Sequence, residues 1–420
     1  MKKLTIDRLG SRGEGIATCE GQRVFVPYAL AGETVSAEIE GDHARLVELV
    51  APSPDRIAPM CRLFGECGGC AVQTLRTEAY RDWKRSLVET ALRNAGLDFP
   101  VGSLVDAHGA GRRRVTFHAR FEQGETRVGF MAARTHRLIE IDACPLLTPE
   151  LAQAPDAARI LAHALAARGK PLDLAITATP EGLDIDLRGA GPLTDDENAV
   201  LVAAARSLDL ARLTNHGRLV ALGAAPHVDI GGVRTPLPPG AFLQATQAGE
   251  EAIAARVLAG AKGAKNIADL FCGVGAFALR LARFSAVSAY DSNASAIDAL
   301  RAATRGTSGL RPVLAESRDL FERPLTAKEL AAFDCVVFDS PRAGAAAQSV
   351  ELAKARVPLV IAVSCNAQSF CRDAAILRDG GYSTDEITPI DQFRFSPHLE
   401  MVAVFRRSNE KKSGRRRLLG

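Results

Sequence analysis

The most constraining feature of the sequence is a set of short apolar runs within residues 241–420, each ending in small or acidic residues. The runs lie at 266–270, 287–291, 334–339 and 357–364. Alanine-rich stretches of helical composition separate most of them. This alternation predicts a doubly wound, mostly parallel sheet that binds ligands at the carboxyl ends of its strands. We therefore expect a Rossmann-like α/β domain at this end of the chain.

Residues 1–52 have a different pattern, because glycine turns divide them into short segments of strand-like composition. These segments lie at 4–8, 15–19, 23–26, 33–40 and 43–50. Five short strands at this spacing favour a small closed β-barrel of OB type, although other small barrels fit the composition equally well. The proline-containing segment 51–59 is predicted to be a linker.

Residues 53–240 have a mixed α+β pattern. A helix is predicted from Thr77, as N-cap, to a stop at Gly96, and Thr194 with Glu197 forms a capping box that opens another. Strands are predicted at 114–121, 127–131 and 138–142, with a hairpin at 181–182. A chain of 420 residues is expected to form several domains. We assign them to 1–52, 53–240 and 241–420.

The composition is that of a soluble globular protein, with 47% hydrophobic and 24% charged residues. A net charge of +3 only mildly favours a polyanionic partner. No stretch reaches the roughly 18 apolar residues of a membrane span, and residues 1–10 lack the apolar core of a signal peptide. We expect a cytoplasmic protein without a membrane partner. The end of the sequence is a basic tail, which we predict to be solvated and which contains Lys411, Lys412, Arg415, Arg416 and Arg417.

A glycine turn, DLFCGVG at 269–275, follows the first apolar run and precedes a predicted helix at 276–283. Gly273 and Gly275 allow a ligand to approach the backbone, and Asp291 closes the next strand, where an acidic side chain suits ribose hydroxyls. The third glycine that cradles phosphates is absent. The turn therefore favours a ligand without pyrophosphate, such as S-adenosylmethionine, over a dinucleotide. A tight turn without a ligand is the alternative.

Three further segments are predicted near strand ends of the same sheet: 339–344, 363–366, and 398–400 leading into a last strand at 401–405. Cys365 at such an end is a candidate nucleophile, although a single free cysteine is more often a buried structural residue. Its neighbours favour the nucleophile, because Asp339 lies one strand away and Glu400 supplies a candidate base. A surface charge is the alternative for Glu400.

Together these residues resemble the RNA 5-methyluridine methyltransferase family over nearly the whole chain. The motifs that carry the resemblance are FLQ (242–244), DLFCGVG (269–275), DSPRAG (339–344), SCN followed by Arg372 and Asp373 (364–373), and HLE (398–400). The N-terminal motifs GEGIA (13–17) and VFVPYALAGETV (24–35) resemble that family's TRAM domain, an RNA-binding barrel of OB type.

The resemblance implies an enzyme that methylates C5 of uridine in RNA with S-adenosylmethionine. Cys365 matches the nucleophile and Glu400 the general base. Positions that line the cofactor are matched by Gln244, Phe271, Asp291, Asp319 and Asp339, the last also contacting the target base. These residue types suit the chemistry: thiolate addition at C6 makes C5 nucleophilic, and a carboxylate then removes the C5 proton.

The chain departs from the family pattern at three positions. The family usually has Asn at the position of Ala276, Pro or Ala at that of Ser340, and Pro at that of Ala367. None of these changes is expected to abolish the chemistry, but the loss of a side-chain donor at Ala276 is expected to weaken cofactor binding.

Four cysteines outside the α/β region are candidate metal ligands: Cys61, Cys67, Cys70 and Cys144. Three clustered cysteines and a distant one followed by proline favour a cubane iron–sulfur cluster over zinc, which prefers close pairs. No bound metal is the third possibility. The resemblance implies a [4Fe–4S] cluster, which we expect to order the middle domain and shape an RNA surface. The remaining cysteines, predicted to be structural, are Cys19, Cys272, Cys335 and Cys371.

RNA is the expected partner, because the target base must leave any stack and RNA loops present splayed bases. Candidate RNA contacts are Arg8, Arg12, Arg23, the run Arg112, Arg113 and Arg114, and His118. Aromatic residues make up only 5% of the chain, which favours recognition by charge and shape. The barrel with the cysteines most resembles the branch that modifies 23S rRNA, with tRNA as the alternative substrate.

Rival hypotheses are a non-catalytic, redox-sensing RNA-binding protein and a DNA cytosine-5 methyltransferase. We expect a monomer.

Overall fold

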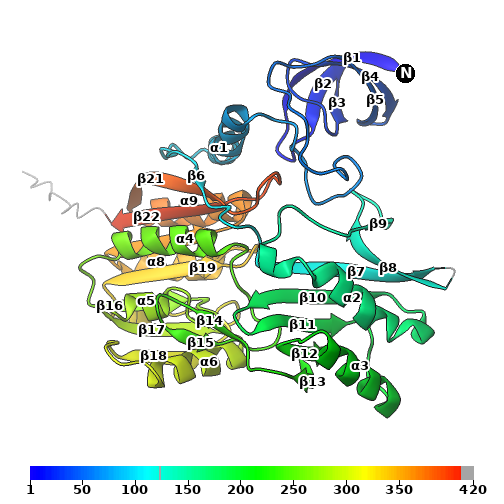
Figure 1. Ribbon diagram of the computed structural model, residues 1–420. Helices are drawn as coiled ribbons and strands as arrows, with labels where there is room; N and C mark the ends of the chain where they lie inside the picture. The colour runs from blue at the N-terminus through cyan, green and yellow to red at the C-terminus, as the bar shows by residue number, and fades with distance from the viewer. Residues whose placement is uncertain (123, 408–420) are drawn as a thin grey trace, which may run out of the picture.

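The structure is a computed structural model that describes residues 1–122 and 124–407 (Figure 1). The predicted basic tail from Lys411 to Arg417 lies outside the described residues. Three sheets account for most of the architecture: a closed barrel, a seven-stranded sheet and an eight-stranded sheet.

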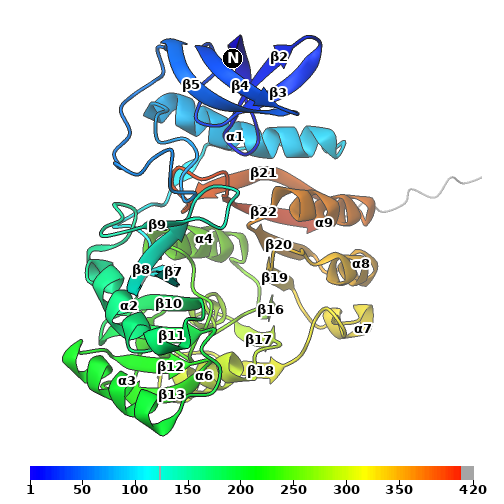
Figure 2. The same cartoon turned by 90° about the vertical axis from the view of Figure 1, so that its right-hand side faces the viewer.

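The N-terminal barrel confirms the prediction for residues 1–52. Its strands, in the order β1-β2-β3-β5-β4, are β1 (Lys2–Leu9), β2 (Gly15–Cys19), β3 (Gln22–Val26), β4 (Thr34–Glu40) and β5 (His43–Ala51). Alternate side chains such as Leu4, Ile6, Val24 and Val26 fill its interior, because successive strand residues face opposite sides. The barrel packs above helix α1 (Thr77–Asn94), at one end of the molecule (Figure 2).

The middle of the chain forms a seven-stranded sheet in the order β13-β12-β11-β10-β7-β8-β9. Its strands are β7 (Arg114–Glu122), β8 (Glu125–Met131), β9 (Leu138–Glu140), β10 (Leu172–Thr179), β11 (Gly182–Arg188), β12 (Arg212–Asn215) and β13 (Arg218–Leu222). Helices α2 (Ala154–His163) and α3 (Asp195–Ser207) cover one face, as Figure 1 shows. The capping box predicted for α3 is present, with both Thr194 and Glu197 engaged.

The C-terminal sheet has eight strands in the order β18-β17-β16-β19-β20-β22-β21-β6. They are β16 (Asn266–Leu270), β17 (Ala286–Asp291), β18 (Val313–Ser317), β19 (Cys335–Ser340), β20 (Leu359–Ser364), β21 (Tyr382–Asp391), β22 (Glu400–Arg407) and β6 (Val105–Asp106). The first five in this order are mutually parallel, and β22 runs antiparallel between β20 and β21. The predicted doubly wound sheet is therefore confirmed.

Helices bury both faces of this sheet, which explains its nearly continuous apolar strands. One face packs against α4 (Gln247–Gly260), α5 (Ala278–Leu281) and α6 (Ala294–Arg305). The other packs against α1, α7 (Ala327–Leu330), α8 (Ala346–Ala355) and α9 (Ala367–Asp379). Figure 2 shows α4 on the side of the middle domain and α7, α8 and α9 on the far side. The chain also forms a small ribbon from β14 (His227–Asp229) and β15 (Arg234–Pro236), and two short 3₁₀ turns at Pro149–Leu151 and Ala166–Arg168.

Two local predictions were wrong. Arg76 and not Thr77 is the N-cap of α1, because Arg76 is extended (φ −61°, ψ 155°) while Thr77 is already helical, so the helix starts one residue earlier than predicted. The helix predicted over 276–283 is a single turn, Ala278–Leu281. In addition, α1 and β6 come from residues 53–240 but pack on the C-terminal sheet, so this segment contributes to two sheets.

Candidate active site

The predicted catalytic residues meet at one edge of the C-terminal sheet. Asp339 lies near the end of β19, and Cys365 directly follows β20. Glu400 begins β22, and because β22 is antiparallel, its first residue lies at the edge where the parallel strands end. The register pairs Ser340 with Ser364 and Ser364 with Met401, so the three segments are direct neighbours. Cys365 is half-buried, whereas Glu400 is only 2% exposed.

Two carboxamides bridge the two carboxylates. Gln244 Nε2 donates to Asp339 Oδ2 at 2.9 Å. Gln392 Nε2 donates to Gln244 Oε1 at 2.6 Å and to Glu400 Oε1 at 3.0 Å, while its Oε1 accepts the N–H of Thr246 at 3.3 Å. The chain of contacts fixes the orientation of both amides. Gln392 was missed by the sequence reasoning, and the only signal was its place in the segment leading to the HLE motif.

Glu400 and Asp339 resist ionisation. Burial raises the pKa of Glu400, Asp339 raises it further, and the hydrogen bond from Gln392 opposes the shift. Burial also raises the pKa of Asp339, against the hydrogen bond from Gln244. Glu400 Oε2 is buried and has no hydrogen-bond partner among the described residues. A buried carboxylate with a free oxygen and a raised pKa has the properties of a general base or acid.

The same groups act on the thiol of Cys365. Burial raises its pKa to about 11, and the charges of Glu400 and Asp339 contribute to the rise. The Arg342 guanidinium, from the DSPRAG segment, opposes it and favours the thiolate. A thiol and two carboxylates thus lie close enough for their charges to act on one another, an arrangement that suits a nucleophile with a neighbouring base.

The glycine turn lies along the same edge, between β16 and α5. Phe271 and Gly273 have left-handed backbone angles, with φ of 61° and 52°. A Cβ on Gly273 would meet no atom within 4 Å, so open space lies beside its backbone. The N–H of Gly273 donates to Asp291 Oδ2 at 2.9 Å, which ties the turn to the end of β17. A Cβ on Gly275 would come within 2.5 Å of Leu300, so this glycine is required by packing against α6.

Asp319 follows β18 at the same edge, so strand order places it beyond Asp291. Its carboxylate accepts the N–H of Phe321 at 2.8 Å and so shapes an exposed turn. The Phe321 ring, 49% exposed, lies 5.5 Å from the ring of Phe271. The edge therefore offers two acidic side chains, an aromatic pair that joins the segment after β18 to the turn after β16, and the glycine turn itself. This arrangement suits an adenosine-containing ligand.

The run of three arginines is divided between two roles. The Nε of Arg113 donates to the carbonyl of Gln244 at 3.1 Å, and its guanidinium pairs with buried Glu250 at 2.5 Å. Glu250 also binds Arg280, which holds the carbonyl of Ala276 at 2.7 Å. Arg113 is therefore an internal support of the Gln244 loop, and its guanidinium is paired inside the protein rather than presented at the surface as an RNA contact would be.

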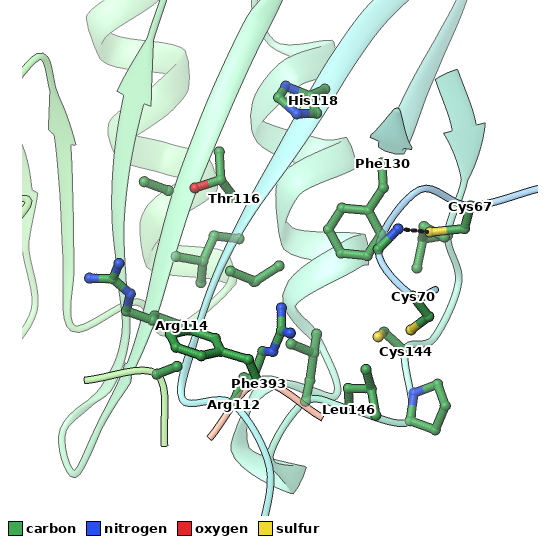
Figure 3. A pocket seen from close by; sticks show the side chains of 18 of the residues that line it. Cys67, Cys70, Arg112, Arg114, Thr116, His118, Phe130, Cys144, Leu146 and Phe393 are labelled. Carbon is green, nitrogen blue, oxygen red and sulfur yellow. Dashed lines mark hydrogen bonds between the residues drawn. The ribbon is translucent and has the colours of Figure 1, made fainter. Parts of the chain in front are cut away.

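The four candidate metal ligands line one cavity of about 660 Å³. Figure 3 shows three of them, Cys67, Cys70 and Cys144. Cys61, Cys67 and Cys70 precede α1 and Cys144 follows β9, and all are half-buried free thiols. Their donor type suits an iron–sulfur cluster. Within the described ranges, no three His, Cys, Asp or Glu side chains converge closely enough to hold a metal ion. Of the other cysteines, Cys272, Cys335 and Cys371 are buried.

Comparisons with known proteins agree with this geometry. The family model described as tRNA (Uracil-5-)-methyltransferase matches residues 240–408, and the TRAM domain model matches residues 2–47. An uncharacterized RNA methyltransferase of Brucella suis is 44% identical over 408 residues, covering 97% of this chain and 98% of the relative. The 23S rRNA (uracil(1939)-C(5))-methyltransferase of Halomonas elongata is 31% identical, covering 96% of this chain and 89% of the relative.

A solved structure shows the same fold: the tRNA (uracil-54, C5)-methyltransferase of Pyrococcus abyssi in complex with S-adenosyl-L-homocysteine. Its TM-score is 0.73 at 21% identity, covering 96% of this chain and 99% of that structure. The sheet, its glycine turn and the N-terminal barrel thus define an S-adenosylmethionine-dependent RNA methyltransferase. More particularly, the chain belongs to the RNA uracil-C5 methyltransferase family. None of the helices described is long and apolar enough to cross a membrane.

Proposed function

We propose that this enzyme methylates C5 of one uridine through a covalent bond between Cys365 Sγ and C6 of the base, with Glu400 as general base. The observation that supports this most is the convergence of Cys365, Glu400 and Asp339 at the sheet edge that also carries the glycine turn. Gln244, Phe271, Asp291 and Asp319 would hold the cofactor along the rest of that edge.

The residues divide the chemistry between them. When bound, S-adenosylmethionine supplies the methyl group. The Cys365 thiol would lose its proton to solvent, helped by the charge of Arg342, and its electron pair would add to C6, so that the C5–C6 double bond becomes an enolate. C5 of this enolate would then accept the methyl group, with the thioether S-adenosylhomocysteine as the leaving group. Glu400 then takes the proton from C5, and the electrons of that C–H bond reform the double bond and expel the thiolate. The raised pKa of Glu400 strengthens it as a proton acceptor.

The same network positions the two reactants. Gln244 joins Asp339 to Gln392, so the side chain expected to contact the target base is linked to the side chain expected to take its proton. Rigid placement of this kind accelerates reaction because the reacting groups need no further ordering.

For the substrate we propose 23S rRNA, since the relative from Halomonas elongata carries that activity in its name. The tRNA alternative is supported by the family description and by the fold of the Pyrococcus abyssi enzyme. Mapping 5-methyluridine in rRNA and tRNA from cells lacking the gene distinguishes them. Loss of one 23S position supports the proposal, and loss of a tRNA position supports the alternative. An unchanged map in both RNAs would contradict uridine methylation as the cellular function.

We propose further that Cys61, Cys67, Cys70 and Cys144 hold a [4Fe–4S] cluster. The support is the donor chemistry of four free thiols that line one cavity, since thiolates are the ligands of such clusters, and not their spacing, because no three described side chains converge closely enough to hold a metal ion. Protein purified without oxygen should contain about four iron and four sulfide per chain. Replacement of Cys70 by Ser should abolish both, whereas Cys19→Ser in the barrel should change neither. Recovery of zinc without sulfide would favour the zinc alternative.

A further inference from the structure

The cavity that contains the four cysteines extends well beyond them. Figure 3 shows Cys67, Cys70 and Cys144 on one side and Arg114 on the other, with Arg112 and Phe393 between. The part of the cavity away from the cysteines contains Arg112, Arg114 and the Phe242 ring that packs against Arg114. We call this the arginine end. A volume of about 660 Å³ is in the range of cavities that bind small organic ligands.

The chemistry of the arginine end suits a flat, anionic ligand. The guanidinium carbon of Arg114 lies 4.7 Å from the centre of the Phe242 ring, and that of Arg112 lies 6.0 Å from the Phe393 ring. Arg112 Nε is buried and has no hydrogen-bond partner in the part of the chain that the structure describes. No described Asp or Glu lines the cavity. Arginine donors beside aromatic rings are the groups that bind phosphates and stack on bases.

The arginine end also adjoins the catalytic edge. Ala245 and Phe393 line the cavity, and the residues before them in the chain are Gln244 and Gln392, which bridge Asp339 and Glu400. Arg113, between Arg112 and Arg114, holds the carbonyl of Gln244. A strand whose uridine reaches Cys365 would therefore have its neighbouring nucleotide close to this opening.

We propose that the arginine end of the cavity binds a second nucleotide of the substrate RNA, next to the target uridine, with its base stacked on Phe242 and its phosphate facing Arg112 and Arg114. This inference rests on the proposed function. Phe242 suits the role because 61% of it is exposed although the side chain is large and apolar. The glycine turn is not part of the cavity lining, so the cofactor and this nucleotide would not compete.

The test combines enzyme variants with altered RNA. The probe is a synthetic stem–loop that contains the target uridine, made intact or with an abasic residue at the position before or after it. The variants are Phe242→Ala and Arg114→Met, with Arg120→Met as the matched control, because Arg120 lies on the same strand as Arg114 but outside the cavity lining. Initial rates of methyl transfer give kcat and KM for each combination, and iron content is measured for each protein.

One abasic position should raise KM for the parent enzyme about tenfold, with little change in kcat. Phe242→Ala should raise KM for intact RNA by a similar factor, and the same abasic position should then have no further effect. Arg120→Met should behave like the parent, and iron content should not change in any variant.

The inference is overturned if the parent methylates all three RNAs equally well, or if the losses from Phe242→Ala and from the abasic residue simply multiply. A parent enzyme that methylates none of the RNAs would instead count against the proposed function itself. An effect of Phe242→Ala on kcat alone would also overturn the inference, because it would assign the ring to the reaction rather than to binding a neighbour.

Discussion

The protein carries thiols in two contrasting places: Cys365 at the sheet edge and the four cysteines of the cavity. All are partly enclosed, and burial raises the pKa of Cys365 and of Cys70 alike to about 11. The difference lies in their neighbours. Cys365 faces two carboxylates joined by two carboxamides, whereas no described Asp or Glu lines the cavity around the other four.

This contrast teaches that the thiol alone does not define a catalytic site. A cysteine nucleophile needs a group that manages the proton on the substrate, and among these five thiols Cys365 is the one whose pKa is raised by the charges of neighbouring carboxylates, Glu400 and Asp339. The four cysteines are held by neutral donors and by the field of Arg112: Gln73 hydrogen-bonds to Cys70, and the N–H of Gly69 donates to Cys67. We therefore expect that changes at the sheet edge affect the chemical step, and that changes at the cavity affect structure and binding.

The largest expected effect follows replacement of the nucleophile. Cys365→Ala should lower kcat by about a thousandfold or more, because no covalent bond to C6 can form. Labelled methyl transfer to RNA measures it. Cys371→Ala, six residues further and buried in α9, is the matched control and should keep kcat within about threefold. An equal loss of kcat in both variants would contradict the assignment of Cys365 as nucleophile and Cys371 as structural.

Replacement of the base should arrest the reaction at a later point. Glu400→Gln should lower kcat by about 10²- to 10⁴-fold, the usual range for loss of a general base. Methyl transfer to C5 remains possible in this variant, so an enzyme–RNA adduct that carries the new methyl group should accumulate. Denaturing electrophoresis with labelled cofactor detects it. A variant that turns over normally would assign the base to another residue.

An intermediate effect is expected at Gln392, which links the base to Asp339. The hydrogen bond from Gln392 lowers the pKa of Glu400, so Gln392→Leu should raise that pKa further. Glu400 accepts a proton only when ionised, and its ionised fraction at a given pH falls as its pKa rises. The rising limb of log kcat against pH should therefore move to higher pH, with about a tenfold loss at pH 7.

The control for Gln392 is Gln247→Leu, an exposed change at the start of α4 that should leave the pH profile unaltered. A loss of activity in Gln392→Leu that is the same at every pH would mean that the side chain acts on folding or binding rather than on the base.

The smallest effect on chemistry is expected at the cavity. Cys67→Ser should leave kcat at saturating RNA within about threefold, while KM for RNA rises several-fold and the melting temperature falls, because a lost structural cluster loosens the domain that surrounds it. Steady-state kinetics and thermal unfolding measure the two readouts. A kcat reduced as strongly as in Cys365→Ala would show that the cavity takes part in the chemical step.

Features that depend on local pattern could be predicted from the sequence. Strand periodicity located the barrel and the doubly wound sheet, and the rule that ligands bind at carboxyl ends brought Asp339 and Cys365 together with the glycine turn. Glu400 could be included because the last apolar run follows it directly.

Features that depend on contacts between distant segments could not. Gln392 and Gln244 are 148 residues apart in the chain, and no periodicity links them. The buried ion pair of Lys84 with Asp391, which fixes the segment before Gln392 to α1, spans 307 residues. Arg113 looked like a surface charge among three arginines, and only tertiary packing shows that it supports the Gln244 loop from inside.

The most direct test of the central claim uses RNA in which 5-fluorouridine replaces the target uridine. Fluorine at C5 cannot leave as a proton, so the reaction should stop with RNA covalently attached to the enzyme. We predict a complex that survives denaturing electrophoresis, forms only with S-adenosylmethionine present, and yields by peptide mapping a nucleotide attached to Cys365. Absence of the complex, or attachment to Cys61, Cys67, Cys70 or Cys144, would contradict the account.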